Sequence, residues 1–177
     1  MGWLPSYQSE ARISAEYVLK NHPGGKVGVL YQDDDYGKDH LKWLKDGLKG
    51  KTRIVAEIPY EVSDPTVDSQ IISLKASGAD ILFDVTTPKF ASRTIKKIAE
   101  LGWKPVHLLN SVSVSVGAVL SPAGLDNSKG LLTAGYLKDA TDPTWKDDPA
   151  LEEWSPSWIS IIQMATRRRS SRCMVIR

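Results

Sequence analysis

Short apolar runs alternate with segments of helical periodicity along most of this 177-residue chain, and this alternation constrains the fold more than any other feature. The apolar runs are typical of buried strands, and the segments between them place apolar residues three or four positions apart. Strands that alternate with helices of about a dozen residues indicate parallel pairing through βαβ crossovers. The sequence therefore predicts a doubly wound α/β fold, with a mostly parallel sheet and flanking helices.

The expected elements follow from periodicity and from residues that start helices. We expect strands at residues 26–31, 53–59, 79–85, 106–109 and 130–136. We expect helices at residues 6–20, 36–49, 65–76 and 88–101, and a short helix or turn at 112–120. Two of these helices begin with a polar cap followed by proline at the first helical position, Asp64-Pro65 and Thr87-Pro88. Residues 33–35 are three aspartates that can cap the helix beginning near Tyr36.

Composition and charge describe a soluble domain with an unusual C-terminal segment. Hydrophobic residues make up 41% of the chain, charged residues 25%, and no run of 18 apolar residues occurs. All 21 acidic residues precede residue 154, whereas residues 155–177 contain five arginines and no acid. Because the basic excess lies in this segment alone, the sequence does not indicate nucleic-acid binding. We expect one domain at residues 1–154, followed by a tail that is either non-native, through a frameshift or fusion, or disordered.

Three polar segments follow strands of the predicted sheet. Ligands bind parallel α/β sheets beyond the carboxyl ends of the strands, where these turns gather. The candidate residues are Asp35, Tyr36, Thr86, Thr87, Asn110, Ser111 and Ser113. Asp35 and Thr87 are also natural helix caps, and Tyr36 is equally compatible with the edge of the core. Helix N-termini at the first two turns favour a carboxylate or another anion.

Signals of catalysis are poor. The chain contains no GxSxG elbow, no Walker loop and no GxGxxG motif after a strand. His22, His40 and His107 are scattered, and the single cysteine, Cys173, lies in the tail. The acidic residues at 33–35 are interpreted as helix caps, and those at 147–148 as part of a solvated loop. We therefore expect a protein that is not an enzyme and that uses neither a metal nor a cofactor.

Five segments carry a resemblance to a known family: GWLPSYQSE (2–10), VLYQDDDYGKDHLKWLKDGL (29–48), YEVSDPTVDSQIISLKASGADILF (60–83), IAELGWKPVHLLNSVSVSVGAVLSPAGLDNSKG (98–130) and YLKDATDPTWKDD (136–148). In this order they resemble the second lobe of the type I periplasmic binding proteins, closest to the branched-chain amino-acid (Leu/Ile/Val-binding) type. The resemblance implies a flavodoxin-like lobe that closes with a partner lobe on a small solute. It also implies delivery of the solute to a membrane ABC permease, and a periplasmic location. A leader peptide is not expected at residues 1–5, which lack a basic start and an apolar stretch.

The resemblance also suggests which turns contact the solute. It assigns a ligand contact to Tyr36, a second to the turn at Thr86 and Thr87, and a third near residues 110–113, where family members often carry an acid for an ammonium group. This sequence has no acid within 110–113, so the amide and hydroxyls there favour a neutral or anionic solute, such as a carboxylic acid.

The resemblance covers one lobe, and this has consequences for the chain. One lobe provides only one wall of the cleft that holds the solute. This lobe alone is expected to bind a solute weakly, because most of the solute surface stays in water. The face that meets the other lobe is expected to promote self-association. A ligand-sensing domain of a regulator or receptor with the same fold is the alternative function, and a flavodoxin-like enzyme is a more distant one.

Overall fold

The computed structural model describes residues 5–135, 144, 147–150 and 153. Contacts divide the chain into one compact unit at residues 1–135 and a second at residues 136–177. The fold and the sites described below belong to the first unit. The expected tail at residues 155–177 lies outside the described residues.

A four-stranded parallel sheet forms the centre of this unit. Its strands are β1 (Lys26–Gln32), β2 (Arg53–Tyr60), β3 (Ile81–Val85) and β4 (Val106–Leu109), in the spatial order β2-β1-β3-β4. Every pairing is parallel, with Tyr31 opposite Val85 and Asp84 opposite Leu109. The predicted doubly wound, parallel α/β fold is therefore confirmed. Because the strands are parallel, their carboxyl ends lie along one edge of the sheet, which we call the carboxyl edge.

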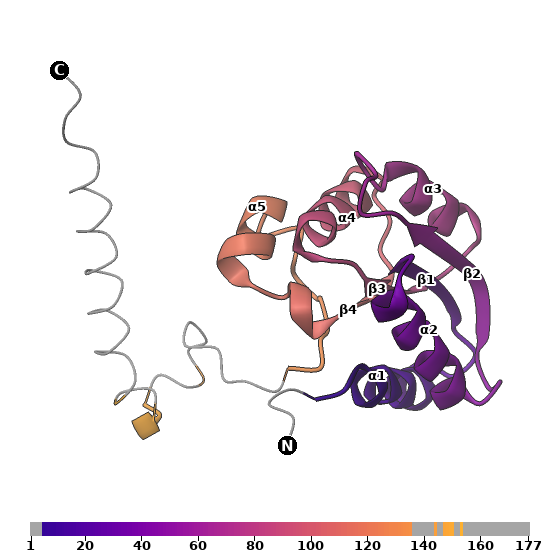
Figure 1. The fold of residues 1–177 in the computed structure, drawn as a ribbon, viewed down its shortest axis with the longest axis horizontal. Helices are drawn as coiled ribbons and strands as arrows, with labels where there is room; N and C mark the ends of the chain where they lie inside the picture. The colour runs from indigo at the N-terminus through magenta and orange to yellow at the C-terminus, as the bar shows by residue number, and fades with distance from the viewer. Residues whose placement is uncertain (1–4, 136–143, 145–146, 151–152, 154–177) are drawn as a thin grey trace. The chain divides into compact units, whose positions relative to one another are not determined.

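Helices cover both faces of the sheet (Figure 1). Helices α1 (Tyr7–Asn21) and α2 (Asp35–Leu48) lie on one face, and α3 (Asp68–Ala76) and α4 (Pro88–Glu100) lie on the other. Strand β3 is buried throughout and shows why two layers are needed. Its residues Ile81 and Phe83 join the core beneath α1 and α2, whereas Leu82 joins the core beneath α3 and α4. A strand with apolar side chains in both directions must be covered on both faces.

Two elements differ from the sequence prediction. Helix α3 begins at Asp68 and not at Pro65, because the Asp64 carboxylate accepts the Glu61 N–H at 2.9 Å and holds a separate turn. The expected strand at 130–136 is reduced, within the described residues up to 135, to one parallel bridge between Leu132 and Leu108. Only the backbone of Leu132 exchanges hydrogen bonds with β4 there.

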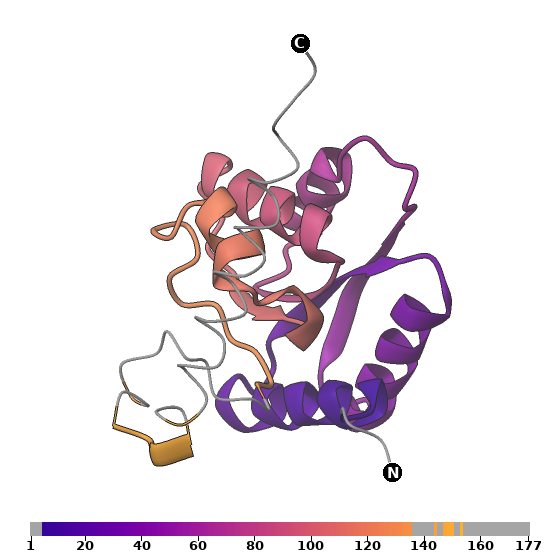
Figure 2. The same ribbon diagram turned by 60° about the vertical axis from the view of Figure 1, so that its left-hand side comes forward.

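The segment after β4 forms three short helical pieces, in agreement with the short helix or turn expected at 112–120. They are η1 (Ser111–Ser113), the π-helical η2 (Val116–Leu120) and α5 (Ser121–Ala123). Figure 2 shows η2 and α5 beside α4, and Val119 and Ala123 pack against Ala91 and Ile95 of that helix. Among the described residues, no helix has the length and apolar character needed to cross a membrane.

Candidate functional site

The turn between β1 and α2 is shaped by Asp34 and Gly37. Asp34 is the N-cap of α2, and its Oδ1 accepts the Gly37 N–H at 3.0 Å. A Cβ atom at residue 37 would lie 2.0 Å from the Gln32 carbonyl oxygen, so only glycine allows the helix to start this close to the strand. Asp35 was expected as a cap, and this was wrong: it is the first residue of the helix, and its side chain is exposed.

Tyr36 lies at the edge of the core, next to the carboxyl edge. Its ring makes edge-to-face contacts with Tyr7 and His40, at centroid distances of 5.0 and 5.1 Å. Its hydroxyl is buried and has no hydrogen-bond partner among the described residues. Burial raises the pKa of this phenol strongly, and the nearby carboxylates of Glu10 and Asp84 raise the pKa further. The hydroxyl therefore stays protonated and is a free donor.

The turn after β3 has one buried and one partly exposed threonine. Thr86 is fully buried and its hydroxyl has no partner among the described residues. Thr87 is the N-cap residue of α4, as expected, but its hydroxyl makes no capping hydrogen bond. That hydroxyl lies 3.4 Å from the Tyr60 hydroxyl, and the Thr87 N–H donates to the Tyr60 oxygen at 3.0 Å.

The turn after β4 is tied to the turn after β3. The Asn110 amide donates to the carbonyls of Asp84 (3.1 Å) and Thr86 (2.8 Å), and its oxygen accepts from Val112 N–H (3.1 Å). The Ser113 hydroxyl donates to the Thr86 carbonyl at 2.5 Å. Asn110 and Ser113 are buried, whereas Ser111 is partly exposed. Asn110 and Ser113 thus join the two turns, and Ser111 is the member of this group nearest to solvent.

A carboxylate that the sequence reasoning missed lies at this third turn. Glu10, in the first turn of α1, accepts the Ser111 N–H at 2.6 Å and the Ser111 hydroxyl at 2.9 Å. The side chain is buried, and burial raises its pKa while the two bonds from Ser111 oppose that rise. The sequence has no acid within residues 110–113, but the fold brings one to this turn from a helix 101 residues away in the chain.

Two further residues lie at the carboxyl edge: Tyr60, which was not predicted, and Gln32, which begins the first of the predicted polar segments. Tyr60 ends β2, is 1% exposed, and donates its hydroxyl to Gln32 Oε1 at 3.0 Å. Gln32 ends β1 and also bonds to Asp34. The position of Tyr60 at the end of a parallel strand is a signal that would have identified it.

The three predicted turns and Glu10 lie along the same edge of the sheet. Tyr36, Thr87 and Ser111 follow β1, β3 and β4, which are adjacent in the sheet. The arrangement combines free hydroxyl donors, one buried carboxylate and the rings of Tyr7 and Tyr36. It holds hydrogen-bonding groups for a small polar molecule, but among these residues no nucleophile is paired with a base. Ligands of parallel α/β folds bind beyond this edge of the sheet.

The sequence pattern of the periplasmic binding proteins matches residues 1–151, and the chain belongs to this family. A Leu/Ile/Val-binding protein homologue from Brucella abortus is 21% identical over 148 residues, covering 78% of this chain and 37% of that protein. The chain therefore spans less than half the length of this curated relative.

Solved structures show the same fold. A substrate-binding periplasmic protein from Ralstonia solanacearum superposes with a TM-score of 0.71 at 22% identity, covering 86% of this chain and 44% of that one. A branched-chain amino-acid ABC transporter protein from Thermus thermophilus, solved with bound valine, gives a TM-score of 0.69 at 17% identity, covering 77% and 36%. The predicted resemblance to type I periplasmic binding proteins is confirmed.

Proposed function

We propose that this chain supplies the second lobe of the solute-binding component of an ABC importer, and that the solute is a small amino acid. The carboxyl edge is the proposed wall of the solute cleft, with Tyr36, Thr87 and Ser111 as its contacts. The membrane permease is the proposed partner and the periplasm the proposed location. The observation that carries the choice of solute is the Glu10 carboxylate at Ser111.

Glu10 changes the solute class that we expected from the sequence. An ammonium group in a closed cleft needs a carboxylate, because leaving the charge unpaired costs several kcal/mol. Each carboxylate oxygen has two acceptor sites, and Ser111 occupies one on each oxygen of Glu10. The remaining sites are suited to an ammonium group, and the neighbouring rings of Tyr7 and Tyr36 add cation–π attraction. A carboxylic acid without an ammonium group is the competing solute.

A titration followed by NMR tests both parts of the proposal. The ¹⁵N-labelled chain is titrated with leucine and with 4-methylpentanoate, which has the same skeleton without the ammonium group. We expect leucine to shift the amide signals of Tyr36, Thr87 and Ser111 at lower concentration. Glu10→Gln should weaken leucine binding about tenfold, since a hydrogen bond to a charged group contributes roughly 1.5 kcal/mol or more. Glu16→Gln is the matched control, because Glu16 is exposed on the same helix.

The outcomes separate the solute class from the function. Equal binding of both compounds, unchanged by Glu10→Gln, would reject the amino acid and favour a carboxylic acid. Absence of saturable shifts at the carboxyl edge with either compound, up to tens of millimolar, would reject solute binding by this wall.

We also propose that the chain self-associates through the carboxyl edge. Three of its exposed large apolar side chains lie at that edge: Tyr7 (40% exposed), Val62 (62%) and Val112 (49%). Tyr7 packs on Tyr36, and Val62 and Val112 follow β2 and β4. In a two-lobe protein this face would be covered, and uncovered apolar surface favours association.

Sedimentation equilibrium tests the self-association. We expect a concentration-dependent dimer that Val112→Asp weakens by about tenfold or more, because a charge in an apolar contact loses its hydration. Ile72→Asp is the control, since Ile72 is equally exposed (50%) but lies on α3. A native chain that remains monomeric at high concentration would overturn this proposal.

A further inference from the structure

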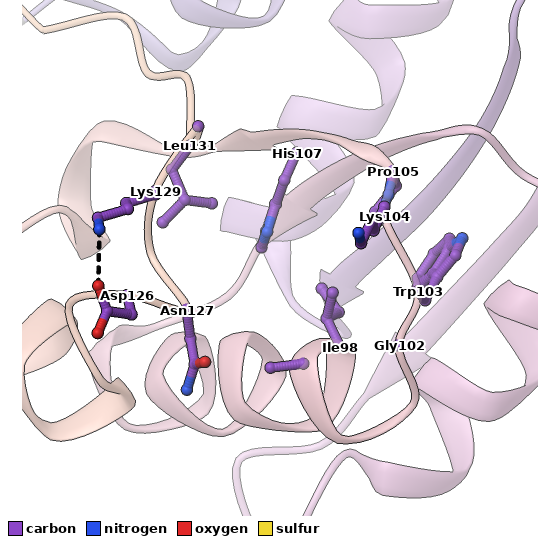
Figure 3. Close-up of a pocket in the computed structure, with 12 residues that line it drawn as sticks. Ile98, Gly102, Trp103, Lys104, Pro105, His107, Asp126, Asn127, Lys129 and Leu131 are labelled. Atoms are coloured by element: carbon purple, nitrogen blue, oxygen red, sulfur yellow. Dashed lines mark ion pairs between the residues drawn. The ribbon is translucent and has the colours of Figure 1, made fainter.

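A pocket lies at the opposite end of the sheet from the carboxyl edge. It is bounded by the last part of α4, the residues that lead into β4, and the loop at residues 126–131 (Figure 3). Its volume is about 390 Å³, within the range of small-molecule sites, which is about 300–1,000 Å³. Since α4 runs opposite to the strands, its C-terminal end lies beside their amino ends. This pocket is therefore separate from the proposed solute wall.

Part of the pocket lining is apolar, and one of its rings is fixed. The apolar side chains of the lining include Ile98, Trp103, Pro105 and Leu131. The indole N–H of Trp103 donates to the Ala79 carbonyl at 3.3 Å, which holds the ring in place. Figure 3 shows Ile98 and Leu131 pointing into the space between β4 and α4, with Trp103 at one end. These walls suit the body of a small aliphatic or aromatic molecule.

A buried polar pair forms part of the lining. His107 lines the pocket and is 6% exposed, and its Nε2 lies 2.9 Å from Oδ2 of the fully buried Asp84. No described residue bonds to the other ring nitrogen, Nδ1. This contact with the Asp84 carboxylate fixes the orientation of the imidazole ring. The proposed solute wall makes no use of the His107 ring.

Two lysines stand at the rim. Lys104 is exposed and has no ion-pair partner among the described residues. Lys129 pairs with Asp126 at 2.7 Å, and both side chains are more than three-quarters exposed. Exposed pairs of this kind are weak, so an incoming anion can replace Asp126. The rim therefore favours a negatively charged ligand.

We propose that this pocket binds a small organic anion with an apolar body. Lys104 and Lys129 attract the anionic group, the Trp103 ring packs against the body, and His107 Nδ1 forms a hydrogen bond with a polar atom of the ligand. Binding here uses none of the three proposed solute contacts, Tyr36, Thr87 and Ser111.

Benzoate is the probe for this site, with benzyl alcohol as the uncharged counterpart. The ¹⁵N-labelled 177-residue chain is titrated at low ionic strength, and the Trp103 indole N–H signal, assigned with Trp103→Phe, is followed. We expect saturable shifts with benzoate, and weaker binding of benzyl alcohol. Lys104→Gln and Lys129→Gln should each raise the Kd of benzoate about two- to fivefold, because an exposed charge contact contributes roughly 0.5–1 kcal/mol. Lys96→Gln is the control, since Lys96 is an exposed lysine of α4 outside the pocket lining.

Both lysines are exposed, so these variants are expected to fold. The proposal is overturned if benzoate produces no saturable shift at Trp103, or if the shifts occur only at Tyr36, Thr87 and Ser111. It is also overturned if the two lysine variants bind benzoate as tightly as the native chain, or if Lys96→Gln weakens binding by the same factor.

Discussion

Acid should destabilise this fold through His40, a residue of α2. The side chain is fully buried, and neither ring nitrogen has a hydrogen-bond partner among the described residues. Its neighbours are the aromatic rings of Tyr7, Tyr36 and Phe83, at centroid distances of 4.8, 5.1 and 6.1 Å. Burial in these surroundings lowers the pKa of His40 from 6.5 to about 4.

The sign and size of the effect follow from linkage. A folded-state pKa below the unfolded value means that the unfolded chain binds a proton first as the pH falls. The contribution of His40 to stability is therefore intact above pH 6.5 and is lost progressively between pH 6.5 and pH 4. The loss is about 2 kcal/mol at pH 5 and reaches roughly 3 kcal/mol below pH 4.

His40→Leu isolates this contribution, because leucine has a similar volume and no titrating group. We would measure the free energy of unfolding of both proteins by urea denaturation at pH 7 and pH 5, followed by tryptophan fluorescence. The native chain should lose about 2 kcal/mol more than the variant over this interval. Other groups, including Glu10 with its raised pKa, titrate in both proteins. Their contributions to the change in unfolding free energy therefore cancel when the two proteins are compared. His22→Leu is the control for removing a histidine outside the core.

Equal losses in the native chain and in His40→Leu would refute the reasoning. If His40→Leu does not unfold in one cooperative transition, His40→Phe offers a second test, because an aromatic ring keeps the contacts with Tyr7 and Tyr36.

Three other changes should alter stability, each measured by urea denaturation at pH 7. Glu10→Ala should cost about 2 kcal/mol, because Ser111 loses two charge-assisted hydrogen bonds; a cost below about 0.5 kcal/mol would mean that water replaces them. His107→Leu should cost about 3 kcal/mol by leaving Asp84 buried and unpaired, and adding Asp84→Leu should recover part of that loss; a double variant less stable than His107→Leu would contradict this reasoning. Asp34→Ala should cost about 1 kcal/mol through loss of the α2 cap, and no change would show that solvent caps the helix equally well.

Local patterns were enough to predict the class of fold and the position of the candidate wall. The 3.6-residue period, the Thr87-Pro88 start signal and the apolar run that becomes β3 are properties of neighbouring residues, so they can be recognised without coordinates. Parallel strands then require the turns after β1, β3 and β4 to share one edge. The start of α3 was missed because Asp64 closes a turn of its own, and local signals do not distinguish that turn from a helix cap.

The chemistry of the two proposed sites depended on contacts between residues far apart in the chain. Glu10 reaches Ser111 across 101 positions, and Asp84 pairs with His107 across a strand pairing, so neither pair produces a local pattern. Such contacts depend on strand order, strand register and the packing of α1 and α2 over the sheet, which only the folded structure specifies. The sequence by itself determined the four central strands, the helices between them and the edge at which their turns gather. The tertiary structure decided which charges meet there, because burial beside a specific partner is a property of the assembled core.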